Sequence, residues 1–117
     1  MTLYADHRDN VLKAACFGGN VEIVKYVLSQ NVLGINSRGA YRQTPLMEAA
    51  SRGHHDVFDV LIEAKADVPL VDEHGNNILH LACLYGQEEM VKYLLSKDYA
   101  DIDTKNSRGK TAATIAK

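Results

Sequence analysis

The sequence has 117 residues, 46% of them hydrophobic, a length that supports one domain rather than two independent cores. Lysine and arginine number 13 and aspartate and glutamate 15, so the net charge is −2, which argues against a nucleic-acid partner. No apolar run approaches the roughly 20 residues that cross a bilayer, and the first ten residues show no secretory signal. We therefore expect an intracellular, soluble protein of the cytoplasm or nucleus, without a membrane partner and monomeric.

Equivalent residues recur along the chain at intervals of 34 and then 33 positions. A leucine, an alanine three residues later and a glycine four residues after that follow the same spacing. The matching positions are Leu12, Leu46 and Leu79; Ala15, Ala49 and Ala82; and Gly19, Gly53 and Gly86. A period of this length is typical of a repeat protein.

The predicted elements follow from this period. In the first unit, apolar residues around Leu12 predict a short helix, and a second apolar cluster follows Gly19. In the second unit, Thr44 and Pro45 predict the start of a helix that Gly53 ends, and residues 54–64 form its partner. The polar stretch 67–76 turns the chain, Asn77 caps the next helix, and residues 108–117 begin a fourth unit.

Each unit is thus a helix pair with a long turn, too small to bury its own apolar face. Stacking the units side by side creates a continuous core. The small residues at the alanine positions let neighbouring helices approach closely.

These residues resemble the ankyrin repeat. The best match to the family's opening motif and second helix is TPLMEAASRGHHDVFDVLIEAKADV (44–68). The next-best match is ILHLACLYGQEEMVKYLLSKDYADI (78–102). VLKAACFGGNVEIVKYVLSQN (11–31) resembles a first repeat, and RGKTAATIAK (108–117) a fourth that is cut short. The resemblance implies an all-α solenoid of stacked helix pairs joined by β-hairpin-like turns. Residues 1–117 then form one domain, with repeats at about 9–38, 39–71 and 72–105 and a partial repeat at 106–117.

The chain departs from the family pattern at several positions. His80 keeps the family's histidine, whereas Met47 and Lys13 replace it in the second and first units. Arg42 stands where the turn usually carries glycine. Lys65 stands where a left-handed conformation is usual, so we expect mild backbone strain there.

The sequence predicts no catalytic, cofactor or metal site. His54 and His55 invite a metal interpretation, but no third ligand lies at a useful spacing, and His54 is expected to bond nearby backbone. Cys16 and Cys83 occupy the same site of units one and three, roughly 20 Å apart, so they cannot form a disulfide within the chain. Both are expected to be buried and unreactive.

The resemblance implies that a partner docks on the turn tips and on the exposed face of the first helices. Aromatic residues and arginine are enriched among interface hot spots. Glu48 and Glu73 lie centrally on this surface and Lys105, Arg108 and Lys110 near its C-terminal end, a gradient that could orient a partner with an acidic end. The expected partner-binding residues are Phe17, Tyr41, Gln43, Ser51, Arg52, Glu73, His74, Asn76, Leu84, Tyr85, Arg108 and Lys110.

These patterns favour a non-catalytic module that binds another protein. An alternative is a regulatory ankyrin segment of a larger enzyme, channel or signalling protein whose activity lies outside this chain. A self-contained hydrolase or metal enzyme is a weaker alternative. The half repeat at 108–117 also leads us to expect that the chain is the front part of a longer protein.

The resemblance implies one modification site. Ankyrin repeats can be hydroxylated at a turn asparagine, and Asn36 holds that position with Leu28 and Ile35 at the expected places.

Overall fold

The computed structural model describes residues 3–30, 35–36 and 38–115, and within these ranges the protein is helical, without a strand. In chain order the elements are α1 (Leu3–Gly18), α2 (Val21–Ser29), the 3₁₀ helix η1 (Ala40–Arg42), α3 (Pro45–Arg52), α4 (His55–Glu63), α5 (Ile78–Leu84), α6 (Glu88–Ser96) and α7 (Ala112–Ile115). The predicted all-α fold class is therefore confirmed.

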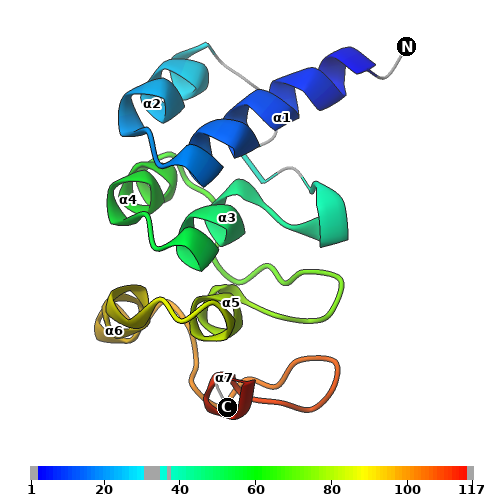
Figure 1. Ribbon diagram of the computed structural model, residues 1–117, viewed down its shortest axis with the longest axis vertical. Helices are drawn as coiled ribbons and strands as arrows, with labels where there is room; N and C mark the ends of the chain where they lie inside the picture. Colours follow the sequence, from blue (N-terminus) through cyan, green and yellow to red (C-terminus); the bar gives the residue numbers. More distant parts are fainter. Residues whose placement is uncertain (1–2, 31–34, 37, 116–117) are drawn as a thin grey trace.

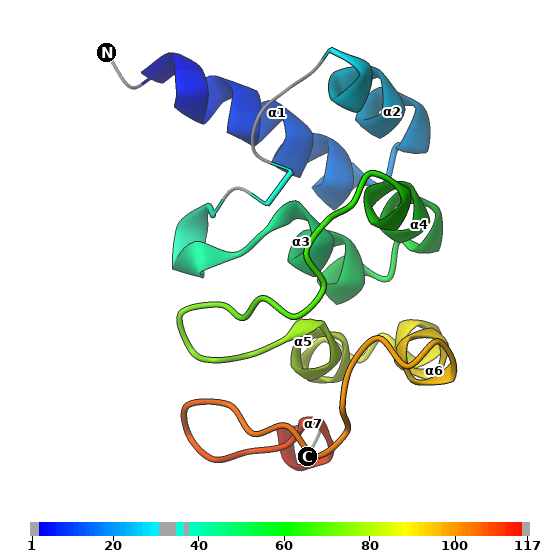
Figure 2. The same ribbon diagram turned by 180° about the vertical axis from the view of Figure 1, so that it is seen from behind.

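The helices form two rows that lie side by side. Figure 1 shows α1, α3, α5 and α7 in one row and α2, α4 and α6 in the other, with the long turns projecting to one side. Each helix of the first row packs against the next one in that row, and each repeat pairs one helix from either row. The same arrangement is seen from behind in Figure 2.

The repeated apolar positions form the core between the helices. The three leucines and three alanines that define the period are all buried and belong to one hydrophobic cluster: Leu12, Leu46, Leu79, Ala15, Ala49 and Ala82. Burying a leucine side chain contributes about 1.5–3 kcal/mol to folding. The alanines occupy equivalent places along the row, as the period predicts.

Polar side chains fix where the first-row helices begin. The Thr44 hydroxyl accepts a hydrogen bond from the Met47 backbone N–H at 3.2 Å, and Pro45 occupies the first turn. Asn77 Oδ1 accepts from the His80 N–H at 2.9 Å in the same way. Both predicted caps are confirmed, and each satisfies a backbone donor that the first turn of a helix leaves free.

The tip between the two helices of a repeat bonds to the preceding repeat. His54 Nε2 donates to the backbone carbonyl of Phe17 at 2.9 Å, so the backbone bond expected for His54 is confirmed. Gln87 Nε2 donates to the Ser51 carbonyl at 3.1 Å from the equivalent position of the next repeat. These bonds set the spacing between successive repeats at this edge.

Glycine is required beside each of these bonds. Gly19 and Gly53 have φ values of 75° and 72°, the left-handed region that glycine enters without steric cost. A Cβ at Gly19 would lie 2.7 Å from the His54 ring, and one at Gly53 2.5 Å from Gln87 Oε1. The repeated glycine therefore serves both the turn and the close approach of the next repeat.

The long turns are also joined to one another. The Glu73 N–H donates to the Tyr41 carbonyl at 2.9 Å, and the Ser107 N–H donates to the His74 carbonyl at 3.0 Å. Two bonds at equivalent positions thus connect three successive turns. The turn tips form one continuous edge.

The first turn differs from the others because Arg42 replaces glycine. Its φ is 60°, and the Arg38 guanidinium donates from Nη1 to the Arg42 carbonyl at 3.0 Å and to the Val71 carbonyl at 2.6 Å. Lys65 has a φ of 74°, so the expected left-handed residue after α4 is confirmed. Asn31, at the matching place after α2, lies outside the described residues.

Candidate protein-binding face

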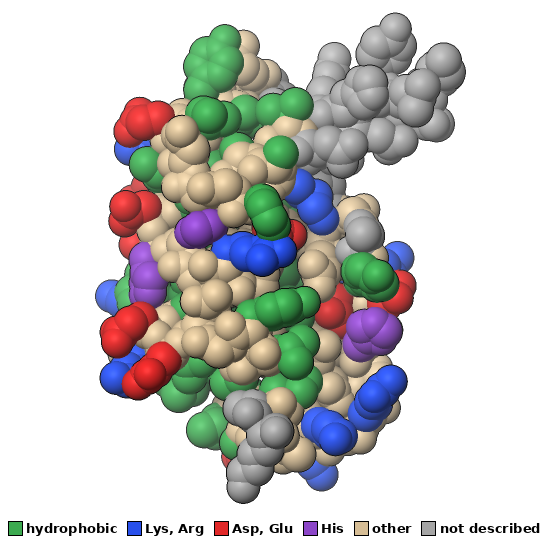
Figure 3. Space-filling view, in the orientation of Figure 1, with side chains coloured by type: hydrophobic (Ala, Val, Ile, Leu, Met, Phe, Trp, Pro, Cys, Tyr) green, Lys and Arg blue, Asp and Glu red, His purple; other side chains and the backbone are tan. Residues whose placement is uncertain are grey.

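Four large hydrophobic side chains that were expected to contact a partner are exposed to solvent. The exposed fractions are 52% for Phe17, 61% for Tyr41, 48% for Leu84 and 53% for Tyr85. We call the surface formed by the turn tips (40–43, 73–76 and 107–110) and the C-terminal ends of α1, α3 and α5 the candidate face. Hydrophobic side chains run down this side of the molecule in Figure 3, and basic ones gather over its third turn.

Arg52 is held in place at the upper part of the candidate face. Its guanidinium carbon lies 4.2 Å from the centre of the Phe17 ring, and its Nε lies 3.3 Å from Glu48 Oε2. The ring on α1 and the carboxylate on α3 together restrict the arginine side chain. A side chain that is already ordered loses less conformational entropy when a partner binds.

The turn tips carry a second cluster of this kind. The rings of Tyr41 and His74 have centroids 6.2 Å apart, and His74 Nε2 lies 3.7 Å from Glu73 Oε2. All three side chains are exposed. The backbone bond from Glu73 to Tyr41 holds their turns together, so this cluster stands on a fixed base.

A cavity of about 310 Å³ lies at the C-terminal end of the candidate face. It is lined from the second and third turns and from α5 and α7. The lining residues are His74, Asn76, Leu84, Asn106, Arg108, Lys110 and Ile115. Five of these were expected to contact a partner. Asn106 and Ile115 were not, because neither is a turn-tip position nor on the exposed face of a complete first helix.

Two of the expected contact residues have little exposed surface. Ser51 is 6% exposed, and its hydroxyl donates to the Glu48 carbonyl at 3.0 Å, because the register of α3 turns this side chain inward. Asn76 is also 6% exposed and lines the cavity. Gln43 is half-buried, and its carbonyl accepts from Lys13 Nζ at 3.0 Å. Contact by all twelve residues stays a prediction.

The cysteines are poorly suited to nucleophilic chemistry. Both thiols are free, with Cys16 buried and Cys83 half-buried, which corrects the expectation that both are fully buried. Burial, and secondarily the Glu48 carboxylate, raises the pKa of the Cys16 thiol to about 12. Burial also raises the pKa of Cys83. A thiol with a raised pKa carries little of the thiolate that reacts.

The part of the chain that the structure describes contains no group of three His, Cys, Asp or Glu side chains placed to hold a metal ion. None of its helices has the length and apolar character needed to cross a lipid bilayer.

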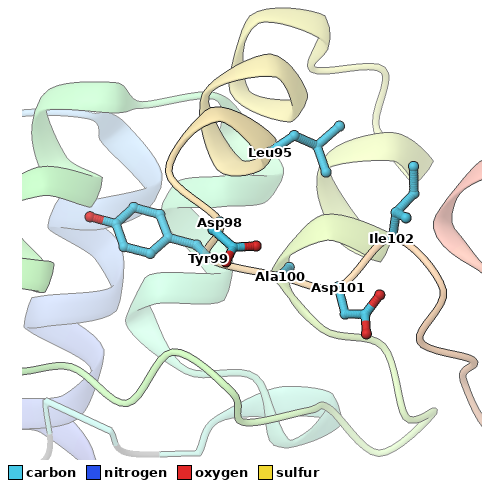
Figure 4. Close-up of a pocket in the computed structure, with 6 residues that line it drawn as sticks. All are labelled: Leu95, Asp98, Tyr99, Ala100, Asp101 and Ile102. Atoms are coloured by element: carbon cyan, nitrogen blue, oxygen red, sulfur yellow. The ribbon is translucent and has the colours of Figure 1, made fainter.

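A larger hollow lies away from the candidate face. It measures about 600 Å³ and lies at the end of α6, between Leu95 and Ile102. Figure 4 shows the Tyr99 ring pointing away from the other residues that line it, and the two carboxylates of Asp98 and Asp101 at its side. Its lining consists of Leu95, Tyr99, Ala100 and Ile102 and the two exposed aspartates.

Asn36 takes part in a bond between successive repeats. Its Oδ1 accepts from the Asp67 backbone N–H at 2.8 Å. Hydroxylation of Asn36 stays a prediction.

Comparison with known families identifies the fold. A model of "Ankyrin repeats (3 copies)" matches residues 3–72, and one of "Ankyrin repeats (many copies)" matches residues 61–116. The chain belongs to the ankyrin repeat family. Ankyrin repeats are non-catalytic modules that mediate binding to other proteins.

Three relatives show the range of proteins that carry similar repeats. The chain is 37% identical over 94% of its length to Ankyrin repeat and KH domain-containing protein mask-1 of Caenorhabditis elegans. It is 35% identical over 92% to the Nuclear factor NF-kappa-B p105 subunit of Gallus gallus, and 30% identical over 92% to the E3 ubiquitin-protein ligase KEG of Arabidopsis thaliana. The chain spans 4%, 12% and 7% of these proteins, so it corresponds to a small part of each.

Proposed function

We propose that this chain binds a partner protein through the candidate face and catalyses no reaction itself. The observation that carries the proposal is the set of four large hydrophobic side chains exposed on that face, beside an arginine that Phe17 and Glu48 hold in place. The hydrophobic core does not depend on these four side chains, since the buried cluster contains none of them.

The exposed side chains suit a protein partner better than other ligands. Aromatic residues and arginine provide large contact areas and are enriched among the residues that dominate binding energy. The net charge of −2 gives little general attraction for nucleic acid. We propose that the module acts as a monomer inside the cell and needs no cofactor.

A capture experiment tests this proposal. The wild-type chain and a Tyr41→Ala/Arg52→Ala/Tyr85→Ala variant are immobilised, and captured proteins are identified by mass spectrometry. The control variant is Tyr26→Ala/Lys92→Ala/Ile23→Ala, which removes exposed side chains of similar kinds from α2 and α6. We expect a partner retained by the wild type and the control and lost by the candidate-face variant. Equal retention by the candidate-face variant, with its thermal unfolding unchanged, would rule this face out.

A second candidate function is regulation of a larger protein that contains these repeats. The observation in its favour is that the chain matches only a small part of each relative, one of which is named as an E3 ubiquitin-protein ligase. The complete reading frame would show whether an enzyme domain is present. If it is, activity measured with and without residues 1–117 should differ, whereas equal activity would argue against this role.

A further inference from the structure

The cavity at the C-terminal end of the candidate face combines an apolar floor with a basic rim. Leu84 and Ile115 supply the apolar surface, and Arg108 and Lys110 supply two cations. Among the residues that the structure describes, no carboxylate lines it. Such a pocket is complementary to a negatively charged group that has an apolar neighbour.

The two cations project from a fixed turn. Asn106 Oδ1 accepts from the backbone N–H groups of Arg108 at 2.9 Å and Lys110 at 3.0 Å. The Lys110 carbonyl also accepts from His80 Nε2 at 2.9 Å, which ties this turn to α5. Within residues 3–30, 35–36 and 38–115, neither cation forms an ion pair. Both charges are therefore free to meet an anion without breaking an existing pair.

Asn76 adds a hydrogen-bond donor at the wall of the cavity. Its side chain is 6% exposed, and its Oδ1 accepts from Asn106 Nδ2 at 2.8 Å. This bond orients the side-chain amide of Asn76. The Nδ2 of Asn76 then has no acceptor among the residues that the structure describes. Buried donors are nearly always paired in native proteins, so this amide lacks a partner that a ligand oxygen would supply.

His74 closes the cavity on the side of the second turn. Two carboxylates stand near this rim, and neither is among the lining residues. Glu73 lies 3.7 Å from the His74 ring, and the buried Asp72 accepts from the backbone N–H groups of His74 at 2.8 Å and Asn76 at 2.9 Å. The charges that face the pocket itself are basic.

We propose that this cavity binds an acidic side chain, aspartate or glutamate, of an extended segment of the partner protein. Its carboxylate accepts from Asn76 Nδ2 and lies between Arg108 and Lys110, and a neighbouring apolar side chain packs on Leu84 and Ile115. This inference rests on the proposed function, since it assigns a partner chemistry to one end of the candidate face.

A polypeptide fits this site better than a nucleic acid or a membrane surface. A phosphate backbone needs a row of cations to match its repeated charge. Here two cations stand beside an apolar floor, and the central part of the face carries Glu48 and Glu73. The pattern matches one carboxylate with an apolar neighbour.

Selection from a random dodecapeptide display library tests the assignment. The baits are the wild-type chain, an Arg108→Gln/Lys110→Gln variant and a Lys97→Gln/Lys105→Gln control that loses the same charge outside the cavity. We expect wild type and control to enrich peptides with Asp or Glu beside a large apolar residue. The Arg108→Gln/Lys110→Gln variant should lose the acidic preference and bind the enriched peptides about tenfold more weakly, as removal of charged hydrogen bonds does.

Other outcomes separate this inference from the proposed function. Enriched peptides without an acidic preference, or with one that the cavity variant retains, would overturn the carboxylate site and leave binding on the candidate face intact. If no peptides are enriched, the carboxylate site is also overturned. The capture experiment tests the proposed function separately. Binding of phosphatidylserine vesicles that depends on Arg108 and Lys110, without acidic peptides, would assign the cations to a membrane instead.

Discussion

His80 Nε2 lies 2.9 Å from the backbone carbonyl oxygen of Lys110 and ties α5 to the turn that precedes α7. The Asn77 N–H donates to His80 Nδ1 at 3.1 Å, so Nδ1 is the acceptor and Nε2 carries the proton. Lys13 makes the matching bond in the first repeat, with its Nζ 3.0 Å from the Gln43 carbonyl. Two different side chains at one register position thus join a helix to the following turn.

The first prediction concerns His80. In His80→Ala the Asn77 N–H loses its bond at a buried site, and the Lys110 carbonyl loses one of its two bonds at a half-buried site. Together these losses should cost about 2–4 kcal/mol of unfolding free energy. Urea unfolding followed by circular dichroism measures this loss. A decrease below about 1 kcal/mol would show that water or another group replaces both bonds.

Met47 offers the reciprocal test at the same register position. It is buried, and its Sδ accepts weakly from the Thr44 N–H at 3.5 Å. Met47→His places an imidazole where His80 stands in the next repeat, within a helix that already has its Thr44 cap. We expect this variant to keep the stability of the wild type or exceed it by about 1 kcal/mol, because the added bonds offset the lost apolar burial.

The second prediction separates the core from the candidate face. Leu46→Ala and Leu79→Ala should each cost about 2–5 kcal/mol, because both side chains are buried in the stacked core. Tyr41→Ala and Tyr85→Ala remove exposed rings and should change stability by less than about 1 kcal/mol. Thermal and urea unfolding of the four variants provide the comparison. Tyrosine variants as unstable as the leucine ones would mean that the faces are assigned wrongly.

The third prediction concerns thiol reactivity. Because burial and Glu48 raise the pKa of Cys16 to about 12, its thiol should react with an aromatic disulfide reagent near pH 8 only when the chain unfolds. Cys83 is half-buried with a pKa raised by burial alone, so it should react slowly but measurably in the folded protein. A Cys83→Ser variant isolates Cys16. Rapid labelling of that variant without denaturant would contradict the buried assignment.

The stacked arrangement could be predicted from the sequence because three residue types recur at one interval. Each of these residues has a separate physical role: Leu46 is buried in the core, Ala49 allows close helix packing, and Gly53 adopts the left-handed turn. Because all three residues recur in the same order in three repeats, the sequence predicts that the units stack in equivalent orientations. The backbone bond of His54 followed from the same alignment and is confirmed.

The candidate site was harder to predict because exposure depends on the neighbouring repeat. Ser51 is polar and close to exposed residues in the sequence, yet the register of α3 turns it inward. Asn76 stands at a turn position but is covered by the third turn, whose Asn106 bonds its side chain. The contact that covers Asn76 comes from the next repeat, and a pattern within one repeat does not record it.

The last prediction concerns the bond between α4 and α6. The Tyr93 hydroxyl donates to Asp59 Oδ1, and this bond, followed by burial and the Asp59 charge, raises the pKa of Tyr93 to about 12. An unfolded tyrosine has a pKa of about 10. The folded state binds this proton more tightly, so the bond stabilises the fold fully below about pH 10 and is lost as pH rises through about 12.

Tyr93→Phe removes this bond and keeps the ring that packs against Phe58, at a centroid distance of 6.1 Å. Wild type should therefore be more stable than Tyr93→Phe near neutral pH, and the difference should shrink above about pH 10. Urea unfolding of both proteins at a series of alkaline pH values measures it, and the other titrating tyrosines and lysines are common to the two. A constant difference across that range would show that the Tyr93 hydroxyl does not donate to Asp59 in solution.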